Sequence, residues 1–385
     1  MIDGKVEEWC ERRDSNPHGG CPLEPKSSAS TSSATFAGAR SIPDARHQDS
    51  PVRADTFWVK PTSLPARVLL AAAAILGLAS CSSYEPPLRI ALIRWPPFEF
   101  LHLAQEKGYF AEEGVEVRLI EFVAVNDTQR AFEHDKIDGG TFSLFQVLQN
   151  REQLTRKMQI PLVIDFSDGA DMLMARPEIA DVRALRGHRV GVTLSPLDIF
   201  FLTRALELHD MTLQDVSLVF VRTADMAEAL RDGKVDAITA YPPNSTEVES
   251  AGFARPIFSS SRIPGEIVDV LALDEAVIRK RPDDVAGVIR AFYRAVQFAQ
   301  QHPEEAWQIM SARERVTPEE FRSALQTGIT LVPLADQQKF LGKDSSLLAV
   351  AARVSQVLKD KGLLTGVHAE HDLLSEHPAA LAVAP

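Results

Sequence analysis

Cysteine is nearly absent from this chain. Among its 385 residues only Cys10, Cys21 and Cys81 are cysteines, and none follows residue 81. Residues 82–385 therefore cannot carry a disulfide scaffold, a thiolate zinc site, an iron–sulfur cluster or a cysteine nucleophile.

An excess of basic residues is also missing. Residues 81–385 hold 44 acidic and 32 basic side chains, and this difference is the whole formal net charge of -12. Because nucleic-acid binding needs Lys and Arg to neutralise phosphates, nucleic acid is not an expected partner. Hydrophobic residues make up 45% and charged residues 24% of the chain, as in ordinary globular proteins.

Catalytic motifs are equally scarce. The sequence contains no G-x-S-x-G, no Walker phosphate loop, no G-x-G-x-x-G and no H-E-x-x-H. The histidines are scattered, and the pair His368 and His371 near the end of the chain has the character of a surface pair. No catalytic residue, cofactor or metal site is therefore expected from the motifs.

The apolar run Val68–Ala79 is too short to cross a membrane. It has 12 residues, whereas a spanning helix needs roughly 20. Basic residues precede it and small residues follow it, which is typical of a secretory signal. Its end, Leu78-Ala79-Ser80-Cys81, resembles a bacterial lipobox, in which the cysteine receives a diacylglyceryl group. We therefore expect an extracytoplasmic or periplasmic protein that is anchored to a membrane through lipid on Cys81; an ordinary signal peptide with an incidental cysteine is the alternative.

The segments before and after this apolar run can also be assigned from the sequence. Residues 1–58 are rich in Ser, Pro, Ala and charge without apolar periodicity, so they are expected to be disordered or to precede the true start of translation near Val59. Residues 59–80 are then the lipoprotein signal peptide, and residues 81–87 a linker.

Two stretches of the body repeat each other at a spacing of about 100 residues. Three blocks match in the same order: Arg89–Leu92 with Arg189–Val192, Val117–Ile120 with Val216–Val219, and Ala131–Thr141 with Ala229–Thr239. Each copy alternates apolar strand patterns with amphipathic helix patterns. Such alternation predicts an α/β fold with two small, mostly parallel sheets flanked by helices.

The chain passes between the two copies twice, which predicts two lobes with a hinge. The first lobe is expected to contain residues 88–176 and 268–370, and the second lobe is expected to contain residues 177–267. Residues 371–385 are expected to form a tail. After residue 273 the pattern is helical, with Pro282, Pro303 and Pro318 at first-turn positions. Because ligands of open α/β sheets bind beyond the carboxyl ends of the strands, a cleft is predicted between the lobes.

Residues that follow the predicted strands are the candidates for this cleft. In the first copy, Trp95 and Phe98 follow the first strand and Ser143 follows the third strand. In the second copy, Ser195 follows the first strand and Tyr241 follows the last strand. Ser195 before Pro196 is also a helix cap with free N–H groups that favour an anion, and Ser143 leads into a helix in the same way. The simpler alternative to ligand binding is helix capping alone for the two serines and packing alone for Tyr241.

Two acidic residues complete the set. Asp168 lies in a turn near the first crossing, where a solvated or capping role is the alternative to ligand binding. Asp269 lies within the apolar run Ile267–Leu273, and a buried carboxylate must be paired or hydrogen-bonded. It is expected either to lock the hinge or to hold a cationic or hydroxyl group of a ligand. Arg94 favours an anion if it points inward, but a solvated arginine is the simpler expectation.

Residues 88 to about 362 resemble a known family, the extracytoplasmic solute-binding proteins of the nitrate/sulfonate/taurine and thiamine-precursor pyrimidine (NMT1-like) type. The resemblance rests on Ala104–Val117, Lys136–Asp138, Leu185–Val192, Lys234–Ala237 and Phe258–Gly265. It implies a type II periplasmic-binding-protein fold with a helical C-terminal region, and a small-molecule ligand captured by hinge closure. It also implies an ABC permease and its ATPase as partners, and a monomer. The ligand itself does not carry over, and Asp168 argues against a fully anionic one.

Two other classes remain open. One is an enzyme on the same fold: pyrimidine-synthesising relatives carry a cysteine-rich motif that this chain lacks, and menaquinone-pathway relatives belong to another compartment. The other is a ligand sensor presented to a membrane kinase.

Overall fold

The computed structural model describes residues 85–123, 125–342, 345–366 and 372–383. All described residues belong to one compact unit, Ser82–Pro385. The predicted extension 1–58, the signal peptide 59–80, the lipidation site Cys81 and the pair His368 and His371 lie outside the described residues. Among the described helices, none is long and apolar enough to span a bilayer.

The first sheet has six strands and joins segments from both ends of the unit. Its spatial order is β11-β4-β10-β3-β1-β2. The strands are β1 (Leu88–Leu92), β2 (Val117–Glu121), β3 (Gly139–Ser143), β4 (Met158–Ser167), β10 (Val268–Asp274) and β11 (Ile329–Leu331). β1 is parallel to β2 and β3, whereas β10 is antiparallel to both β3 and β4, and β11 to β4.

The second sheet has five strands in the order β7-β6-β8-β5-β9. They are β5 (Met172–Ala175), β6 (Arg189–Val192), β7 (Ser217–Phe220), β8 (Ala237–Ala240) and β9 (Arg255–Ser259). β6 is parallel to β7 and β8, and β5 is antiparallel to β8 and β9. The repeated strands are thus parallel, as predicted, while the strands beside the crossings run antiparallel and make each sheet mixed.

The sequence repeat corresponds to a repeat of topology. β1, β2 and β3 occupy the places that β6, β7 and β8 occupy in the second sheet, and β10 corresponds to β5. In each copy an arginine in the first or second position of the first strand pairs with the aspartate that precedes the third strand. The Arg89 backbone N–H donates to Asp138 Oδ2 at 2.7 Å, and the Arg189 N–H donates to Asp236 Oδ2 at 2.9 Å. The guanidinium of each arginine donates to the other carboxylate oxygen.

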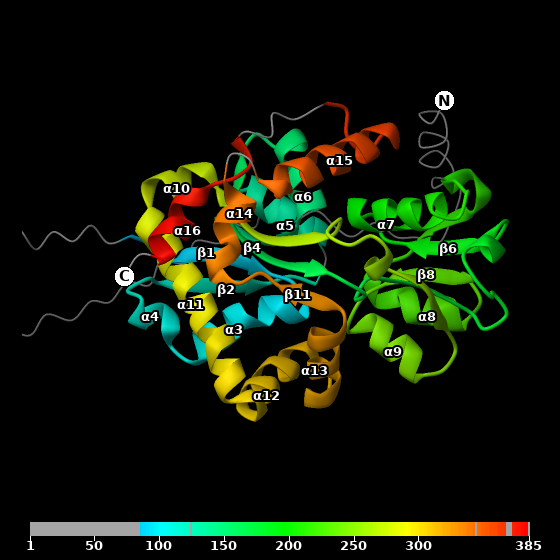
Figure 1. The fold of residues 1–385 in the computed structure, drawn as a ribbon, viewed down its shortest axis with the longest axis horizontal. Helices are drawn as coiled ribbons and strands as arrows, with labels where there is room; N and C mark the ends of the chain where they lie inside the picture. Colours follow the sequence, from blue (N-terminus) through cyan, green and yellow to red (C-terminus); the bar gives the residue numbers. More distant parts are fainter. Residues whose placement is uncertain (1–84, 124, 343–344, 367–371, 384–385) are drawn as a thin grey trace, which may run out of the picture. The chain divides into compact units, whose positions relative to one another are not determined.

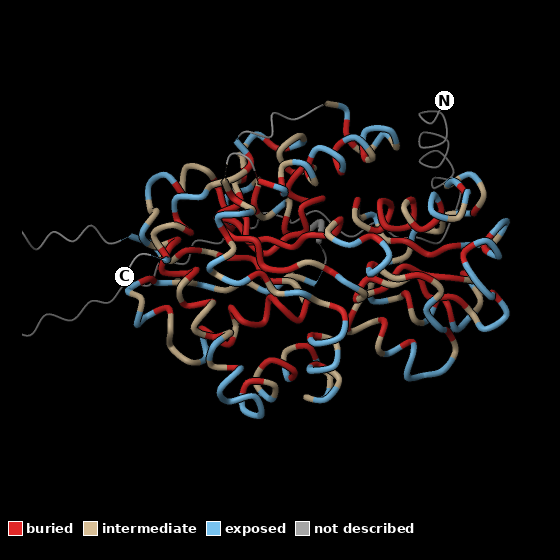
Figure 2. Tube along the Cα trace, viewed as in Figure 1, coloured by how far each residue is buried: buried red, intermediate tan, exposed pale blue. Residues whose placement is uncertain are grey.

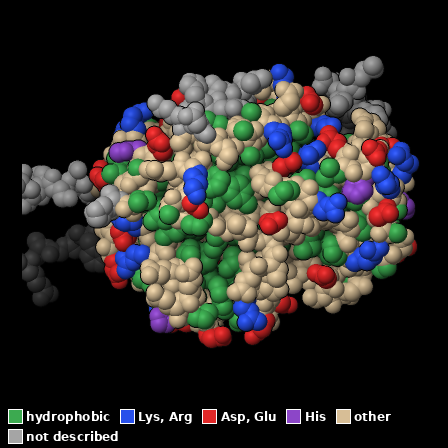
Figure 3. Space-filling view, viewed as in Figure 1, with side chains coloured by type: hydrophobic (Ala, Val, Ile, Leu, Met, Phe, Trp, Pro, Cys, Tyr) green, Lys and Arg blue, Asp and Glu red, His purple; other side chains and the backbone are tan. Residues whose placement is uncertain are grey.

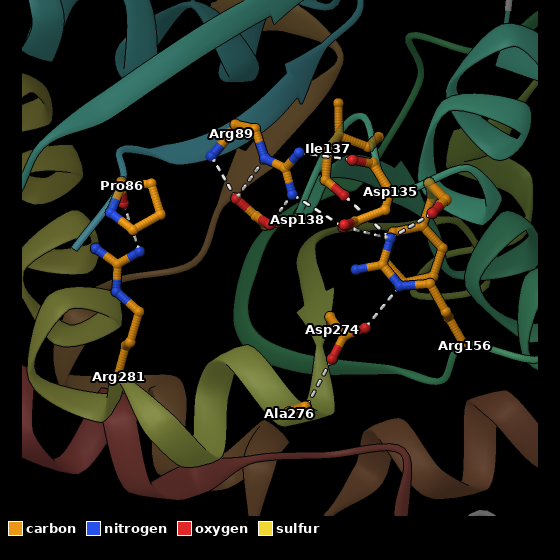
Figure 4. Close-up of polar contacts among 10 residues, drawn as sticks. Pro86, Arg89, Asp135, Ile137, Asp138, Arg156, Asp274, Ala276 and Arg281 are labelled. Atoms are coloured by element: carbon orange, nitrogen blue, oxygen red, sulfur yellow. Dashed lines mark hydrogen bonds and ion pairs between the residues drawn. The ribbon is translucent and has the colours of Figure 1, made fainter.

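In the first lobe this pair belongs to a larger network (Figure 4). Asp135 accepts a second hydrogen bond from Arg89 at 3.0 Å, and Arg156 Nε donates to Asp274 at 2.9 Å. The network joins the start of β1, the turn before β3 and the end of β10, so it fixes the end of the sheet opposite the carboxyl ends of its parallel strands.

Helices flank both sheets (Figure 1). In the second lobe α7 lies over one face of the sheet, and α8 and α9 lie over the other. The helices of the unit are α3 (Glu99–Glu106), α4 (Tyr109–Glu112), α5 (Val125–Glu133), α6 (Leu144–Gln153), α7 (Pro196–Glu207), α8 (Met226–Arg231), α9 (Asn244–Ser250), α10 (Glu275–Lys280), α11 (Pro282–Gln301), α12 (Pro303–Glu314), α13 (Pro318–Thr327), α14 (Gln337–Leu341), α15 (Ser346–Asp360) and α16 (Glu376–Val383).

Most of the predicted helix starts are confirmed. Pro282, Pro303 and Pro318 each begin their helix at the first position, where a missing N–H leaves no bond unmade.

The first crossing lies earlier than the expected boundary at residue 176. β5 pairs with β8 from Met172 onward, so the chain leaves the first sheet between residues 168 and 171 and returns between residues 260 and 267. Gly169, with φ of +128°, takes a conformation that favours glycine, and the chain turns there rather than at Arg176-Pro177. The buried residues follow the strands of both sheets and the inner sides of the helices (Figure 2).

Candidate functional site

A cavity of about 480 Å³ lies where the two sheets meet. Its walls come from residues at or just after the carboxyl ends of β1, β3, β6, β7 and β8, with further side chains from β10, α6, α7 and the residue before β5. The volume is within the range typical of sites for small organic molecules. The lining residues are Ile93, Arg94, Trp95, Phe98, Val123, Asp127, Ser143, Gln146, Asp171, Thr193, Leu194, Ser195, Leu197, Asp198, Phe220, Val221, Arg222, Thr223, Ala224, Tyr241 and Asp269.

Six of the seven residues predicted to bind a ligand line this cavity: Trp95, Phe98, Ser143, Ser195, Tyr241 and Asp269. Asp168 does not. Its side chain is exposed, and its backbone N–H donates to the Gly328 carbonyl at 2.8 Å. The physical reason is the two-residue period of an extended chain: Asp165 and Ser167 are buried, while Phe166 and Asp168 are less buried or exposed.

Trp95 and Tyr241 form an aromatic contact between the two lobes. Their ring centroids lie 5.9 Å apart with an interplanar angle of 79°, an edge-to-face arrangement that aromatic pairs favour. Trp95 also donates from its indole Nε1 to Asp165, at 3.2 and 3.3 Å to the two carboxylate oxygens. The indole is thereby held in one orientation at the cavity wall.

The two serines serve as helix caps and also line the cavity. The Ser195 Oγ accepts a hydrogen bond from the Leu197 N–H at 3.2 Å at the start of α7. The Ser143 N–H donates to Gln146 Oε1 at 3.0 Å at the start of α6. Ser195 therefore caps α7 through its side chain, and Ser143 begins α6 in a capping box with Gln146. A ligand-binding role for either serine remains a prediction.

Asp165 and Asp269 form a buried carboxyl pair at the base of the cavity. They lie opposite each other on β4 and β10, and each carboxyl interacts with the other. Burial raises the pKa of both carboxyls well above the ordinary range; the negative charge of Asp171 adds to the rise at both, and Asp165 adds to it at Asp269.

Two further aspartates, Asp171 and Asp198, line the cavity and escaped the sequence analysis as ligand candidates. Burial raises the pKa of Asp171 to about 7. Burial also raises the pKa of Asp198, although its carboxylate accepts a hydrogen bond from the Thr193 N–H at 2.8 Å. Asp198 stands at the third position of α7 after the cap Ser195, so the Ser-x-x-Asp capping pattern was the available signal.

The basic residues of the cavity lie away from these four carboxyls. Arg222 is at the rim, where its side chain is 85% exposed and bonded to Asp225. Arg94 is half-buried. Burial raises the pKa of Glu314, and the positive charges of Arg313 and Arg94 act in the opposite direction. Asp127 is paired with Arg130.

Two other hollows are lined mainly by apolar side chains. One contains Phe166, Phe340, Leu347 and Val350, and the other Phe100, Val296, Trp307 and Leu325. Hydrophobic side chains gather on the face shown in Figure 3, around the area that Figure 1 labels β4 and α14. The first hollow includes the buried Glu266, which is paired with Arg204 and Arg353. Neither hollow combines aromatic walls from both sheets with carboxyls that lack a basic partner, so the cavity between the lobes is the candidate site.

Comparison with known proteins identifies the family. The model of the NMT1/THI5-like family matches residues 95–306, and the chain belongs to this family. An aliphatic sulfonates-binding protein of Bacillus subtilis (strain 168) is 25% identical over 222 residues, which cover 55% of this chain and 65% of the relative. The 4-amino-5-hydroxymethyl-2-methylpyrimidine phosphate synthase THI13 of Saccharomyces cerevisiae is 22% identical over 238 residues, which cover 56% of this chain and 68% of the relative.

A solved structure agrees on the fold. The periplasmic aliphatic sulphonate binding protein SsuA from Escherichia coli superimposes with a TM-score of 0.64 at 15% identity, covering 77% of this chain and all of SsuA. The predicted periplasmic-binding-protein fold is therefore confirmed. The relatives include both binding proteins and an enzyme, so the fold alone does not decide the activity.

Proposed function

We propose that this protein is the solute-binding component of an ABC importer and that it captures a small organic molecule between its lobes. The observation that carries the proposal is the cavity itself, whose walls come from both lobes and whose aromatic residues Trp95 and Tyr241 meet across it. Binding-protein relatives of the same fold support it.

The geometry suggests how binding produces a signal. A ligand that contacts Trp95 on one lobe and Tyr241 on the other makes its full set of contacts only when the lobes are close. Such a ligand shifts the open–closed equilibrium by its difference in affinity for the two states. The permease then recognises the closed form, and the ATPase supplies the energy of transport.

Ligand binding is tested by thermal unfolding of the purified protein with a panel of sulfonates, nitrate, pyrimidines, amines and aromatic acids. We expect at least one member to raise Tm in a concentration-dependent way, since a ligand that binds only the native state stabilises it by RT ln(1 + [L]/Kd). Trp95→Phe should weaken the response, whereas Trp307→Phe, outside the cavity, should leave it unchanged. A panel in which nothing raises Tm contradicts the proposal.

Catalysis and sensing are separated from import by two measurements. Mass spectrometry of a bound panel member after prolonged incubation should return it unchanged; a product would favour an enzyme. Deleting the gene should abolish cellular uptake of that molecule. Unchanged uptake with a lost transcriptional response would favour a sensor.

The proposal includes extracytoplasmic anchoring by lipid on Cys81. Cys81→Ser should release the protein from the membrane fraction, because the thiol that receives the lipid is gone. Cys10→Ser and Cys21→Ser are matched controls that remove one cysteine each and should leave membrane association unchanged. Membrane association that survives Cys81→Ser would overturn the anchor.

A further inference from the structure

The base of the cavity is acidic without a neutralising partner. Asp171, Asp198 and Asp269 line it and are each no more than 6% exposed, and Asp165 is fully buried directly behind them. None of the four forms an ion pair with a Lys or Arg among the described residues. Buried carboxylates are ordinarily paired with a cation or bound by several donors.

The hydrogen bonds that these carboxyls receive are few. Asp165 is bonded by the Trp95 indole and Asp198 by the Thr193 N–H. The Ser167 hydroxyl beside Asp171 and the Thr193 hydroxyl beside Asp198 also favour the ionised form of these carboxyls. Asp269, although it faces the cavity, has only the Asp165 carboxyl as its hydrogen-bonding partner within the described part of the chain. Asp269 therefore has hydrogen-bonding capacity left for a group that enters the cavity.

We propose that the ligand is a small organic cation, an ammonium or amidinium group on an apolar body, whose N–H donors bind Asp269 and Asp171. The inference rests on the proposed function and names its substrate class. It differs from the sulfonate named for the bacterial relative, since a sulfonate at this position would face four acidic groups.

The walls suit an organic cation better than a metal ion. The described residues contain no group of three or more His, Cys, Asp or Glu side chains placed to hold one metal. Trp95 and Tyr241 instead offer aromatic surface beside the carboxyls, and aromatic rings attract organic cations at short range. Leu194, Leu197 and Phe220 provide apolar wall for the rest of the molecule.

Proton release gives the proposal a direct signature. The Asp171 carboxyl faces Asp165 and Ser167 on β4, Asp269 on β10, Asp198 on α7 and Tyr241 after β8, while Arg94 and Arg222 stand on the walls. A cation favours the ionised form of this cluster, so its binding releases protons and tightens as pH rises from 6 to 8. An anion requires the protonated cluster and shows the opposite trend.

The test uses three probes of nearly equal shape and different charge: benzamidine, benzamide and benzenesulfonate. Calorimetric titration of the purified protein at pH 6, 7 and 8 should show that benzamidine binds most tightly and increasingly so at higher pH. Tighter binding of benzenesulfonate or benzamide, or benzamidine affinity that falls with pH, overturns the cation assignment. Binding that requires Ca²⁺ or Mg²⁺ and disappears with EDTA overturns it as well.

Asp269→Asn is the decisive variant, and Asp168→Asn is its control. Both remove one carboxylate near a crossing, but Asp168 is exposed and outside the cavity. Asp269→Asn should weaken benzamidine binding at least about tenfold, and Asp168→Asn should leave it unchanged. If Asp269→Asn does not fold, benzamidine binding is measured on Asp171→Asn instead. If the folded variants bind benzamidine with wild-type affinity, the cation assignment is wrong.

The two proposals fail in different ways. The probes are therefore accompanied by a panel of amines, amidines and guanidines and an equal panel of sulfonates, carboxylates and neutral amides. If only anionic or neutral members bind, the cation assignment is wrong and the binding function stands. If no member of either panel binds, both proposals fail.

Discussion

Beneath the Trp95 turn, two glutamates and an arginine are buried together. Glu99 is fully buried, Glu314 is 2% exposed, and the Arg313 side chain, 7% exposed, donates to Glu99 and lies 2.8 Å from Glu121. Neither Glu314 carboxylate oxygen has a hydrogen-bond partner among the described residues. Burial, followed by the charge of its partner glutamate, raises the pKa of Glu99, and burial raises that of Glu314 to about 7.

We expect Arg313→Leu to lower the free energy of unfolding by about 3 kcal/mol at pH 8, since it leaves buried carboxyl groups without their cation. The loss should be smaller at pH 5. A carboxyl whose pKa is raised in the folded state is protonated at low pH and carries no charge to bury, and stability falls as pH rises from about 4.5 through about 7.

Urea unfolding at both pH values measures this difference. Arg315→Leu, two residues later in the chain, is the control and should have little effect at either pH. An equal loss for Arg313→Leu at pH 5 and pH 8 would contradict the assigned charge state.

At the scale of elements, each copy of the repeat places a glycine where its first and third strands meet. Ala91 pairs with Gly140 in the first sheet, and Gly191 pairs with Ile238 in the second. A Cβ on Gly140 would lie 2.6 Å from Ala91 Cβ and 2.7 Å from its carbonyl oxygen, whereas one on Gly191 would lie 3.1 Å from the Ile238 Cγ2. The glycine is on the third strand in the first copy and on the first strand in the second copy, but in both copies one residue of the pair is glycine.

Gly140→Ala should therefore destabilise the protein by about 3 kcal/mol, because the new methyl group meets backbone that cannot move freely. Gly191→Ala should cost about 1 kcal/mol, since it meets the ends of side chains. Thermal and urea unfolding of both variants give the comparison. If Gly191→Ala were the more destabilising, the close contact at Gly140 would not be the controlling one.

The repeat also explains which elements were predictable from sequence. The strands of each copy carry matching residues, such as Arg89 and Arg189, so their existence and parallel order followed from the pattern. The strands at the crossings carry no such match. β5 was assigned to the first lobe because an apolar run alone does not say which sheet it joins, and the antiparallel pairing of β10 depends on contacts far apart in sequence.

For the site, position after a strand was enough to find Trp95, Ser143, Ser195 and Tyr241 near the cavity. The acidic residues were harder. The turn composition indicates Asp168 but does not show which side chains point inward, so it does not identify Asp165 or Asp171. The strand period and the capping pattern were present in the sequence and favour Asp165 and Asp198, but the rise in pKa arises only when separate elements bring four carboxyls together.

At the scale of the whole molecule, the carboxyls of the cavity make the stability of the unliganded protein depend on pH. The pKa of Asp171 is about 7 in the folded protein against 3.8 ordinarily. Its protonated form is thus favoured by folding, and stability is lost as pH rises from about 4 through about 7.

Without ligand, Tm should fall between pH 6 and pH 8, by roughly 2–4 °C for each kcal/mol lost. Asp171→Asn, which cannot ionise, should have a higher Tm than the wild type at pH 8 and a flatter pH profile. Asp168→Asn serves again as the exposed control. A wild-type profile that rises between pH 6 and pH 8 would contradict the raised pKa.

Three of the four carboxyls lie close to the two segments that join the sheets: Asp165 is on β4 before the first segment, Asp171 is the last residue of that segment, and Asp269 is the second residue of β10 after the second segment. Asp171 precedes β5 of the second sheet and faces Asp165 and Asp269 of the first, so once these carboxyls ionise at higher pH their repulsion acts across the hinge and favours separation of the lobes. A guest that neutralises this charge removes the force that keeps the molecule open. Ligand selectivity and lobe closure then depend on the same carboxyl groups. A variant in which these carboxyls are replaced so that a neutral ligand binds should therefore populate the closed state even without ligand.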